Sequence, residues 1–401
     1  MDGHRRNAQN LEVDAHRTSR REGLKRSSTP FVLQVLLLAA VVLLGCATII
    51  SRQIAAQPLK RYTSVLVLYT AVIYLPLYWL ILLLLLLTGA VPWSQLRFVW
   101  TRLSGHGSFP VAFFAICALG DSVGDTIQAI CVPHVSGPVH SLANTCISIF
   151  IAMLSMCVFN ERYSLTQCAA LLAVFAAVVI GFLPSLEGST TTDPAFAVIA
   201  GGSCFFYAVS FVVKELVFKR FKVWQAESHC GDAGLNIFVM NAHLALFQLP
   251  LTILLIPLNE LLKQTNGEGI FAYSKEAFDC VFYDAHSCGP ESNHGELAGL
   301  CVGVCVAVTV LWNLMIVLCV KHTGALATNI ALKAIFPVSA VLFAYVDWPL
   351  LGPTRLSWLV WLSILLLVPS IGAYQWATHV QAQRGETARC CLPSRPPGLL
   401  D

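Results

Sequence analysis

Charged residues are scarce in this chain. Only 12% of its 401 residues are Asp, Glu, Lys or Arg, whereas a soluble protein of this size carries about 25%. Hydrophobic residues make up 56% of the chain, and the mean hydropathy is +0.70. This composition excludes an ordinary soluble domain and predicts an all-α polytopic membrane protein. The net charge of +3 says little, because the distribution of charge matters more here.

Motifs for catalysis and for nucleotide-driven work are missing as well. The sequence holds no GxSxG, no HExxH and no Walker-type GxxxxGK[ST]. The last absence argues against an ATP-driven pump, and we expect neither an enzyme nor a bound cofactor. Two loop cysteines and His286 offer too few ligands for a zinc site, so no metal is expected. The basic residues form no reading surface for nucleic acid, which is therefore not an expected partner.

Ten apolar runs are long enough to cross a bilayer. The predicted spans are 31–51, 63–88, 109–132, 136–158, 163–185, 194–213, 235–259, 297–320, 323–346 and 356–377. Two linkers between them are longer than the rest, 214–234 and 260–296. The predicted domains are a disordered tail 1–30, a first five-helix repeat 31–185, a second repeat 186–378 with the loop 260–296, and a tail 379–401.

An odd number of spans in each half gives the halves opposite orientations. This is the inverted-repeat plan of many secondary transporters, which place a central cavity between the repeats. A faint internal echo supports the plan: Ser136-Gly137 opens the fourth span, and Thr323-Gly324 opens the ninth, 187 residues later. We therefore predict ten transmembrane helices as a five-plus-five inverted repeat around a cavity.

Lysine and arginine predict which ends of the spans face the cytosol. With the N-terminus in the cytosol, that side collects 18 basic residues and the other side 6. Both tails are then cytosolic, and the loop 260–296 faces a lumen or the outside. The N-terminal tail is Arg-rich but also carries acidic residues, unlike most transit peptides. A cytosolic tail is the favoured interpretation, and a cleaved transit peptide is the alternative.

The third predicted span, Phe109–Val132, carries charge at mid-depth. Asp121 lies near its middle, with Asp125 and Gln128 further along. A charged group at the bilayer centre costs about 2.5–3.5 kcal/mol on insertion scales, so such groups face a cavity or a partner. The two carboxylates are four residues apart and share one side of a helix. Gly120 and Gly124 repeat this spacing on the neighbouring stripe, where another helix can approach closely.

Other polar side chains fall inside the spans. Lys333 is the only Lys or Arg well inside any predicted span; it either pairs with Asp121 or receives an anionic group. His140 and His243 can titrate in an acidic compartment, although packed neutral histidines are the favoured interpretation. The predicted substrate- and proton-binding residues are Asp121, Asp125, Gln128, His140, Asn144, Asn241, Asn313, Asn329 and Lys333.

The loop and tail cysteines differ from the cysteines of the spans. Residues 269–284 form an amphipathic, aromatic-rich segment that suits a helix lying on the membrane. A disulfide between Cys280 and Cys288 is expected if the loop lies on the non-cytosolic side. Cys390 and Cys391, beside Arg389, are palmitoylation candidates, with an unmodified tail as the equal alternative.

Residues 40–378 resemble the chloroquine-resistance-transporter family of the drug/metabolite transporter superfamily. The matching pieces are FFAICALGD ending at Asp121, Gly137 of HVSG sixteen residues later, KELVFKRFK at 214–222, MNAHLALFQLP at 240–250, FDC at 278–280, and the spacing from Asn313-Leu314 to Pro337. The resemblance implies ten helices in an inverted repeat and an electronegative cavity, with Asp121 on a cavity acid of the family. It also implies an acidic, lysosome-like vacuolar membrane.

Three departures from the family pattern bear on the solute. An acidic residue of the family appears here as Trp312, Lys333 adds a positive charge, and the loop has two cysteines where some members have four. The family's export of amino acids, small peptides and cationic drugs with protons is therefore one expectation. Neutral or anionic solutes stay open, and a related plastid branch is linked to thiol peptides such as glutathione.

The sequence thus predicts a proton-coupled secondary transporter of small organic solutes in a vacuolar or lysosome-like membrane, with a plastid envelope as the less favoured location. Its partners are then the solute, protons and membrane lipid. The oligomeric state is left open, and a monomer is compatible with the sequence. Two alternatives remain: a glutathione/thiol transporter or a nucleotide-sugar or sugar-phosphate exchanger, and, in another class, a non-transporting membrane scaffold or receptor.

Overall fold

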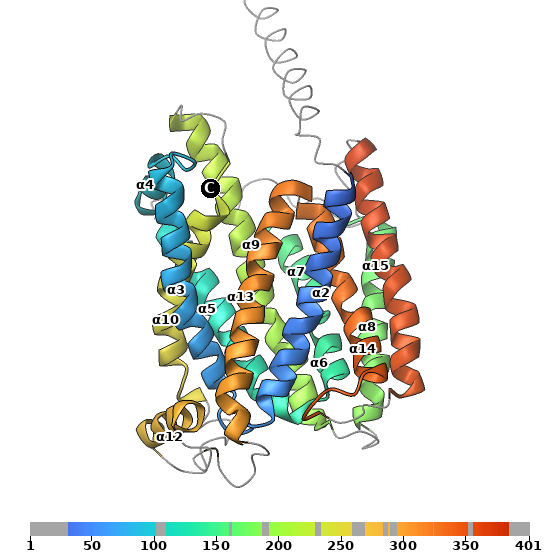
Figure 1. Cartoon of the computed structure of the whole chain (residues 1–401). Coiled ribbons are helices and arrows are strands. Elements are labelled where there is room, and N and C mark those ends of the chain that lie inside the picture. The colour runs from blue at the N-terminus through green and yellow to red at the C-terminus, as the bar shows by residue number, and fades with distance from the viewer. Residues whose placement is uncertain are drawn as a thin grey trace, which may run out of the picture.

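Every regular element in the described part of the chain is a helix (Figure 1). The structure, a computed structural model, describes residues 31–101, 110–159, 163–186, 192–228, 234–258, 269–283, 288, 295–323, 325–351 and 356–384. Four short helices join or flank the long ones: α4 (Ser94–Trp100), η1 (Val132–His134), α12 (Ile270–Phe282) and η3 (Gly295–Leu297). The all-α class predicted from composition is confirmed over these residues.

Nine helical segments among the described residues are long and apolar enough to cross a membrane. They lie in α2 (Phe31–Ala56), α3 (Ser64–Leu87), α5 (Pro110–Cys131), the pair α6 (Gly137–Ala143) and α7 (Cys146–Phe159), α8 (Leu165–Leu186), α9 (Pro194–Ser228), α10 (Ile237–Leu254), α13 (Ala298–Thr323) and α15 (Trp358–Arg384). A further helix, α14 (Ala325–Tyr345), occupies the predicted ninth span, and its apolar part, Ala331–Tyr345, is shorter. The chain is an integral membrane protein.

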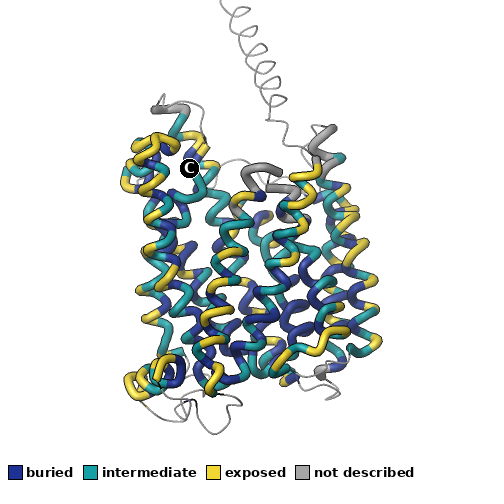
Figure 2. Tube along the Cα trace, in the orientation of Figure 1, coloured by how far each residue is buried: buried dark blue, intermediate teal, exposed yellow. Residues whose placement is uncertain are grey.

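Large apolar side chains cover the outside of this bundle. Leu87, Leu172 and Leu365 are 72%, 68% and 71% exposed, and Figure 2 shows exposed positions along the outer helices while buried positions gather inside. A water-soluble protein rarely exposes apolar side chains in patches of this extent. The outer faces are therefore the surface that contacts lipid.

Helix α9 corrects one predicted boundary. The sixth span was placed at 194–213 with a linker after it, but the helix continues to Ser228. The extra residues contain no Gly or Pro, so no residue type that breaks helices interrupts them. Val217 and Phe221 are buried on one face, while Glu215 and Lys219 form an ion pair of 2.7 Å on an exposed face. The segment taken for a linker is an amphipathic end of the helix.

The fourth predicted span, 136–158, is broken rather than continuous. Helix α6 ends at Ala143, the next two residues, Asn144 and Thr145, form a turn, and α7 begins at Cys146. The Thr145 hydroxyl donates to the carbonyl oxygen of Leu142 at 2.7 Å, a local bond that competes with regular helix geometry. Hydropathy detects the apolar run but not the break inside it.

Particular helix pairs hold the bundle together. The most extensive contacts join α8 with α15, α5 with α9, and α2 with α13. The α5–α9 approach depends on glycine: a Cβ added at Gly120 would lie 2.7 Å from the carbonyl oxygen of Phe206, and one at Gly124 would lie 3.0 Å from the Tyr207 ring. The predicted close approach of another helix along this glycine stripe is confirmed, because side chains there would separate the two helices.

The two ends of the described bundle are distinct. The start of α2 and the end of α15 lie at one end, and α12 lies at the other (Figure 1). Among the long helices, α2, α5, α9 and α13 run through the middle of the view (Figure 1), and Arg52, Asp121, Asp125 and Lys214 lie on three of these four.

Candidate functional site

Asp125 is held between three helices. From α5, its carboxylate accepts a hydrogen bond from the Tyr207 hydroxyl of α9 at 2.7 Å and one from the Gln248 side-chain amide of α10 at 3.4 Å. Both donors are neutral, so neither of them cancels the charge of an ionised Asp125. Gln248 also offers its backbone oxygen to the hydroxyl of Ser122 at 3.4 Å. The three helices thus meet around one acidic group.

Arg52 of α2 lies close enough to Asp125 for an electrostatic interaction, without forming a direct ion pair within 4 Å. Tyr74 of α3 and Tyr207 also lie within electrostatic range of this guanidinium. An acid and a base are therefore present in one polar region but separated by more than a contact distance.

Asp121 lies about one turn away and has a direct partner. Its carboxylate forms an ion pair of 2.7 Å with the ammonium group of Lys214 on α9. Each side chain is 19% exposed, so most of the pair is shielded from solvent. A carboxylate held this closely keeps its charge compensated within the bundle. The pair ties α5 to α9 on the same seam as Gly120 and Gly124.

Lys333 of α14 is not the partner of Asp121. Its ammonium group donates to the hydroxyl of Ser148 on α7, and no carboxylate within 4 Å is found for it among the described residues. The Asp121–Lys333 pair considered from the sequence is therefore absent. Lys333 is also not the only basic residue that lies within a long helix beside polar groups. Arg52 on α2 and Lys214 on α9 do so as well.

Gln128 joins α5 to α9, and His140 is buried on α6. The Gln128 side chain donates to the Ala200 carbonyl at 2.7 Å and to the Ser203 hydroxyl at 2.9 Å, both on α9. His140 on α6 is 3% exposed, and its Nδ1 has no hydrogen-bond partner among the described residues. Gln128 satisfies the backbone of α9 and lies outside the cluster of charged groups around Asp125.

The four predicted asparagines take different places. Asn313 on α13 donates to the Tyr74 hydroxyl and to the Thr309 carbonyl, the latter at 2.9 Å, so it joins the region near Arg52. Asn144 lies at the α6–α7 break. Asn241 is half-buried on α10, and Asn329 lies on α14 with its side chain outside the described residues.

We call Arg52, Tyr74, Asp121, Asp125, Tyr207, Lys214, Gln248 and Asn313 the central polar cluster. Of these, only Asp121, Asp125 and Asn313 were predicted as site residues. Arg52 and Lys214 fall at or just beyond the ends of the predicted spans, so they were assigned to loops. Tyr74 and Tyr207 gave no signal, because a tyrosine in a span is usually a packing residue.

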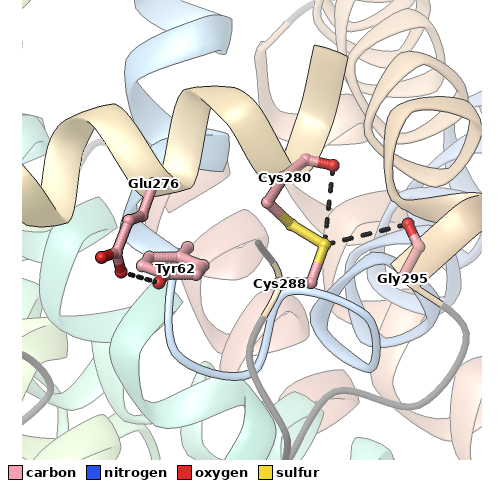
Figure 3. Close-up of a disulfide and its surroundings, with 5 residues drawn as sticks. All are labelled: Tyr62, Glu276, Cys280, Cys288 and Gly295. Atoms are coloured by element: carbon pink, nitrogen blue, oxygen red, sulfur yellow. Dashed lines mark hydrogen bonds between the residues drawn. A yellow bond between two sulfur atoms is a disulfide. The ribbon is translucent and has the colours of Figure 1, made fainter. Parts of the chain in front are cut away.

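The predicted disulfide between Cys280 and Cys288 is present (Figure 3). It anchors α12, which matches the predicted segment 269–284. Figure 3 also shows the Tyr62 hydroxyl donating to Glu276 of α12 at 2.8 Å. Cys390 and Cys391 lie outside the described residues. No group of three or more His, Cys, Asp or Glu side chains that could hold a metal occurs in the described ranges.

Several known proteins are similar to this chain in sequence. Crt homolog 2 of Dictyostelium discoideum is 24% identical over 283 residues, covering 64% of this chain and 56% of the relative. Crt homolog 1 of the same organism is 22% identical over 342 residues, covering 78% and 70%. Protein CLT2, chloroplastic, of Arabidopsis thaliana is 22% identical over 354 residues, covering 87% and 77%.

The chain thus spans little more than half the length of the first of these relatives. A family model described as CRT-like, chloroquine-resistance transporter-like, matches residues 33–368. This range contains all ten predicted spans, apart from the first two residues of the first span and the end of the tenth. This match covers most of the chain and the whole central polar cluster. The chain belongs to the CRT-like, chloroquine-resistance transporter-like family.

Proposed function

We propose that this protein is a secondary transporter of small organic solutes that works by alternating access. The observation that carries the proposal is the central polar cluster, where Asp125 and Arg52 lie within electrostatic range of each other and form no ion pair within 4 Å. Maintaining charge inside a membrane bundle is costly, and such groups usually mark a substrate or ion pathway. Membership of the CRT-like family supports the same class of function.

We propose further that the two halves form an inverted repeat. In such a repeat each helix of one half corresponds to the helix five spans away in the other half. The third span, α5, then corresponds to α13, the fourth, with α7, to α14, and the sixth, α9, to α2. The pair α5–α9 therefore corresponds to α13–α2, and the pair α7–α9 to α14–α2. All four pairs are among the extensive contacts of the bundle, which supports the symmetry. The central polar cluster takes side chains from both predicted halves, so rocking of one half against the other would change the cluster directly.

Within the cluster, we assign two roles to the two carboxylates. Asp125, with its neutral donors Tyr207 and Gln248, would receive the ammonium group of an amino acid, a small peptide or a cationic drug. Asp121 would carry the proton: protonation removes its charge, which weakens the 2.7 Å pair with Lys214 and loosens α5 from α9. This coupling would drive export from an acidic vacuole or lysosome-like organelle.

The orientation supports this direction of transport. The start of α2 and the end of α15 share one end of the bundle, and α12 lies at the other (Figure 1). If this end is cytosolic, the disulfide-bearing α12 faces the lumen, where disulfides persist. The chloroplastic name of one Arabidopsis relative keeps a plastid envelope as the alternative location.

The proposal is tested by uptake into proteoliposomes under an imposed pH gradient. Labelled amino acids, small peptides, glutathione and sugar phosphates are offered to the wild type and to variants. We expect Asp125→Asn to lose at least tenfold in uptake at subsaturating solute, because an ammonium group loses its counter-charge, and Tyr207→Phe to lose less. Asp347→Asn, at an exposed position, is the matched control and should transport normally.

Proton coupling has its own readout. Asp121→Asn should transport at a rate that no longer responds to the pH gradient, because the residue can no longer exchange a proton. Uptake by the wild type that is independent of the pH gradient and unchanged in Asp121→Asn would refute the coupling. That result would leave the proposal of a transporter with a binding site at the central polar cluster intact, but without proton coupling.

A second candidate function is favoured by Lys333, an interior cation that contacts a hydroxyl and no described carboxylate. An anionic solute, such as a sugar phosphate or glutathione, would supply the missing negative charge. Lys333→Met should then abolish uptake of the anionic solute and leave cationic solutes unaffected. Lys222→Met, at an exposed site, serves as the control; equal loss of all solutes in Lys333→Met would indicate a structural role instead.

A further inference from the structure

A cavity of about 110 Å³ lies near the α12 end of the bundle, apart from the central polar cluster. Its walls come from α3, α5 and α10, and α12 covers it. Residues of the walls and cover are Ser64, Val65, Leu68, Tyr69, Thr126, Thr252, Ile256, Tyr273, Ser274 and Phe278. Most of these side chains are apolar or aromatic. A fully apolar cavity of about 150 Å³ can bind benzene, so this one suits a branched alkyl group or a small ring.

Two hydroxyl groups in this cavity lack partners. Thr126 of α5 is 2% exposed and Thr252 of α10 is 3% exposed, and neither hydroxyl has a hydrogen-bond partner among the described residues. This is unusual for a helical threonine, which ordinarily donates to a carbonyl one turn earlier. Leaving a buried hydroxyl unsatisfied costs about 1–3 kcal/mol. Both threonines belong to the lining of the same cavity.

The cover of the cavity is fixed in place by several bonds. The Tyr273 hydroxyl of α12 donates to the Arg61 carbonyl at 2.8 Å and lies 3.3 Å from the Ser64 hydroxyl. Burial raises the pKa of Tyr273 to about 12, so the phenol keeps the proton that it donates. Glu276 pairs with Arg61 at 3.8 Å, and the disulfide closes the far end of α12. The cavity therefore has a built roof and is not a gap under a loose segment.

The cavity adjoins the central polar cluster along two helices. Thr126 follows Asp125 directly on α5, and Thr252 lies one turn beyond Gln248 on α10, toward the α12 end of the bundle. Gln248 itself donates to Asp125. The cavity therefore lies next to the central polar cluster along both α5 and α10.

We propose that this cavity is a specificity subsite for the transported solute and receives a small apolar side group that carries one hydroxyl. The apolar walls accept the body of the group, and Thr126 and Thr252 hydrogen-bond its hydroxyl. The inference rests on the proposed transport function for the identity of its occupant. A hydrocarbon chain of a membrane lipid would fill the walls but leave both threonines unsatisfied.

Binding is tested on the purified full-length chain in nanodiscs, without any transport. The probes are p-cresol and toluene, which share a ring and a methyl group and differ in one hydroxyl. Titrating the melting temperature gives a dissociation constant for each probe. We expect tighter binding of p-cresol, and we expect Thr126→Val and Thr252→Val each to reduce the p-cresol/toluene preference about two- to tenfold, the value of one hydrogen bond.

Two further variants make this measurement specific. Thr70→Val on α3 removes a hydroxyl that is bonded to the Leu66 carbonyl and lies outside the cavity, so the preference should be unchanged. Ser274→Phe places a ring in the cavity from α12 and should abolish the binding of both probes. Equal binding of p-cresol and toluene by the wild type, or the same preference in wild type and both threonine variants, overturns the proposal.

Transport supplies the second arm. Competition for uptake is compared within the pairs threonine and valine, and tyrosine and phenylalanine, which differ by a hydroxyl or its methyl replacement. In the wild type the hydroxylated member should compete better, and Thr126→Val with Thr252→Val should remove this advantage. If the probes bind as expected but the wild type transports nothing, the proposed function fails and the cavity stands. If the wild type transports with no such advantage, the assignment as a solute subsite is wrong.

Discussion

At the scale of single residues, partners distinguish the two carboxylates of α5. Asp121 contacts an ammonium group at 2.7 Å, whereas Asp125 contacts a phenol and an amide. Depth in the span favoured Asp121 as the more important residue from the sequence. Because Lys214 compensates the charge of Asp121, we propose Asp125 as the solute-binding acid, while the charge of Asp121 holds two helices together.

Breaking the Asp121–Lys214 pair should cost stability. Asp121→Asn leaves a largely shielded ammonium group without its counter-charge, and we expect a loss of about 1–3 kcal/mol, somewhat below the value for a fully buried pair. The double variant Asp121→Asn with Lys214→Met should recover part of the loss, because it removes both charges. Melting temperatures of the four proteins in detergent measure this coupling; strictly additive losses would show that the pair contributes nothing.

The sequence could show which polar residues lie inside the spans, but not which side chains they contact. Hydropathy marks Asp121, Asp125 and Lys333 because each interrupts an apolar run. It does not mark Arg52 or Lys214, because a long basic side chain near the end of a run is the ordinary signal of a loop. Arg52 reaches the cluster because α2 continues to Ala56, and Lys214 because α9 continues to Ser228.

At the scale of elements, the α5–α9 seam depends on the absence of side chains. Gly120→Ala would bring a Cβ within 2.7 Å of the Phe206 carbonyl oxygen, so the helices must separate, at a cost of about 1–3 kcal/mol. Gly303→Ala on α13 is the matched control, because nothing lies within 4 Å of its added Cβ. That substitution should be neutral or stabilise by up to about 1 kcal/mol. Thermal unfolding in detergent separates the two; similar losses would argue against the close approach.

Helix α12 should depend on its disulfide for local order. Cys280→Ser with Cys288→Ser opens a short covalent loop, and we expect a loss of about 2 kcal/mol or more in the anchoring of α12. Hydrogen exchange should accelerate across 270–282 while α5 and α9 keep their protection. Cys157→Ser, at an exposed free thiol, should leave the exchange unchanged. Unaltered exchange across 270–282 in the double variant would show that packing alone holds the helix.

Element positions were largely predictable because each span must bury its backbone bonds in a helix of fixed minimum length. The length of α9 was not predicted because its last residues are polar on one face. Their polarity lowers the mean hydropathy, although the helix itself continues to Ser228. The α6–α7 break was missed for the opposite reason: Asn144 and Thr145 are too few to interrupt an apolar run. Local hydrogen bonding, which hydropathy does not measure, decides such breaks.

At the scale of the whole molecule, the arrangement of the ends gives a topological prediction. In sealed organelle vesicles whose outer face is cytosolic, protease should remove an epitope from either tail and leave an epitope inserted at 289–294 intact. Detergent should expose the inserted epitope as well, which controls for its intrinsic susceptibility. Protection of either tail, or cleavage of the insertion in sealed vesicles, would contradict two cytosolic termini.

The class of the molecule followed from composition, and its family from short motifs spaced along the chain. The arrangement of helices did not follow from either, because apolar residues that face lipid and apolar residues that face another helix look alike in a sequence. The α3, α5, α10 and α12 cavity is an example. Thr126 and Thr252 are separated by many residues, and only the packing of four helices places them around one cavity.

The break between α6 and α7 gives the two predicted halves different mechanical properties. Its counterpart in the second half, α14, has no turn between Ala325 and Tyr345, although Pro337 lies inside it. Two helices joined by a turn can pivot at that turn, whereas a continuous helix moves more nearly as one piece. We therefore expect the two ends of the bundle to open by different movements: pivoting of α6 about Asn144 at the α12 end, and tilting of α14 as one piece at the other. A transporter built in this way would have unequal opening and closing rates on its two sides, even if its two halves share one ancestry.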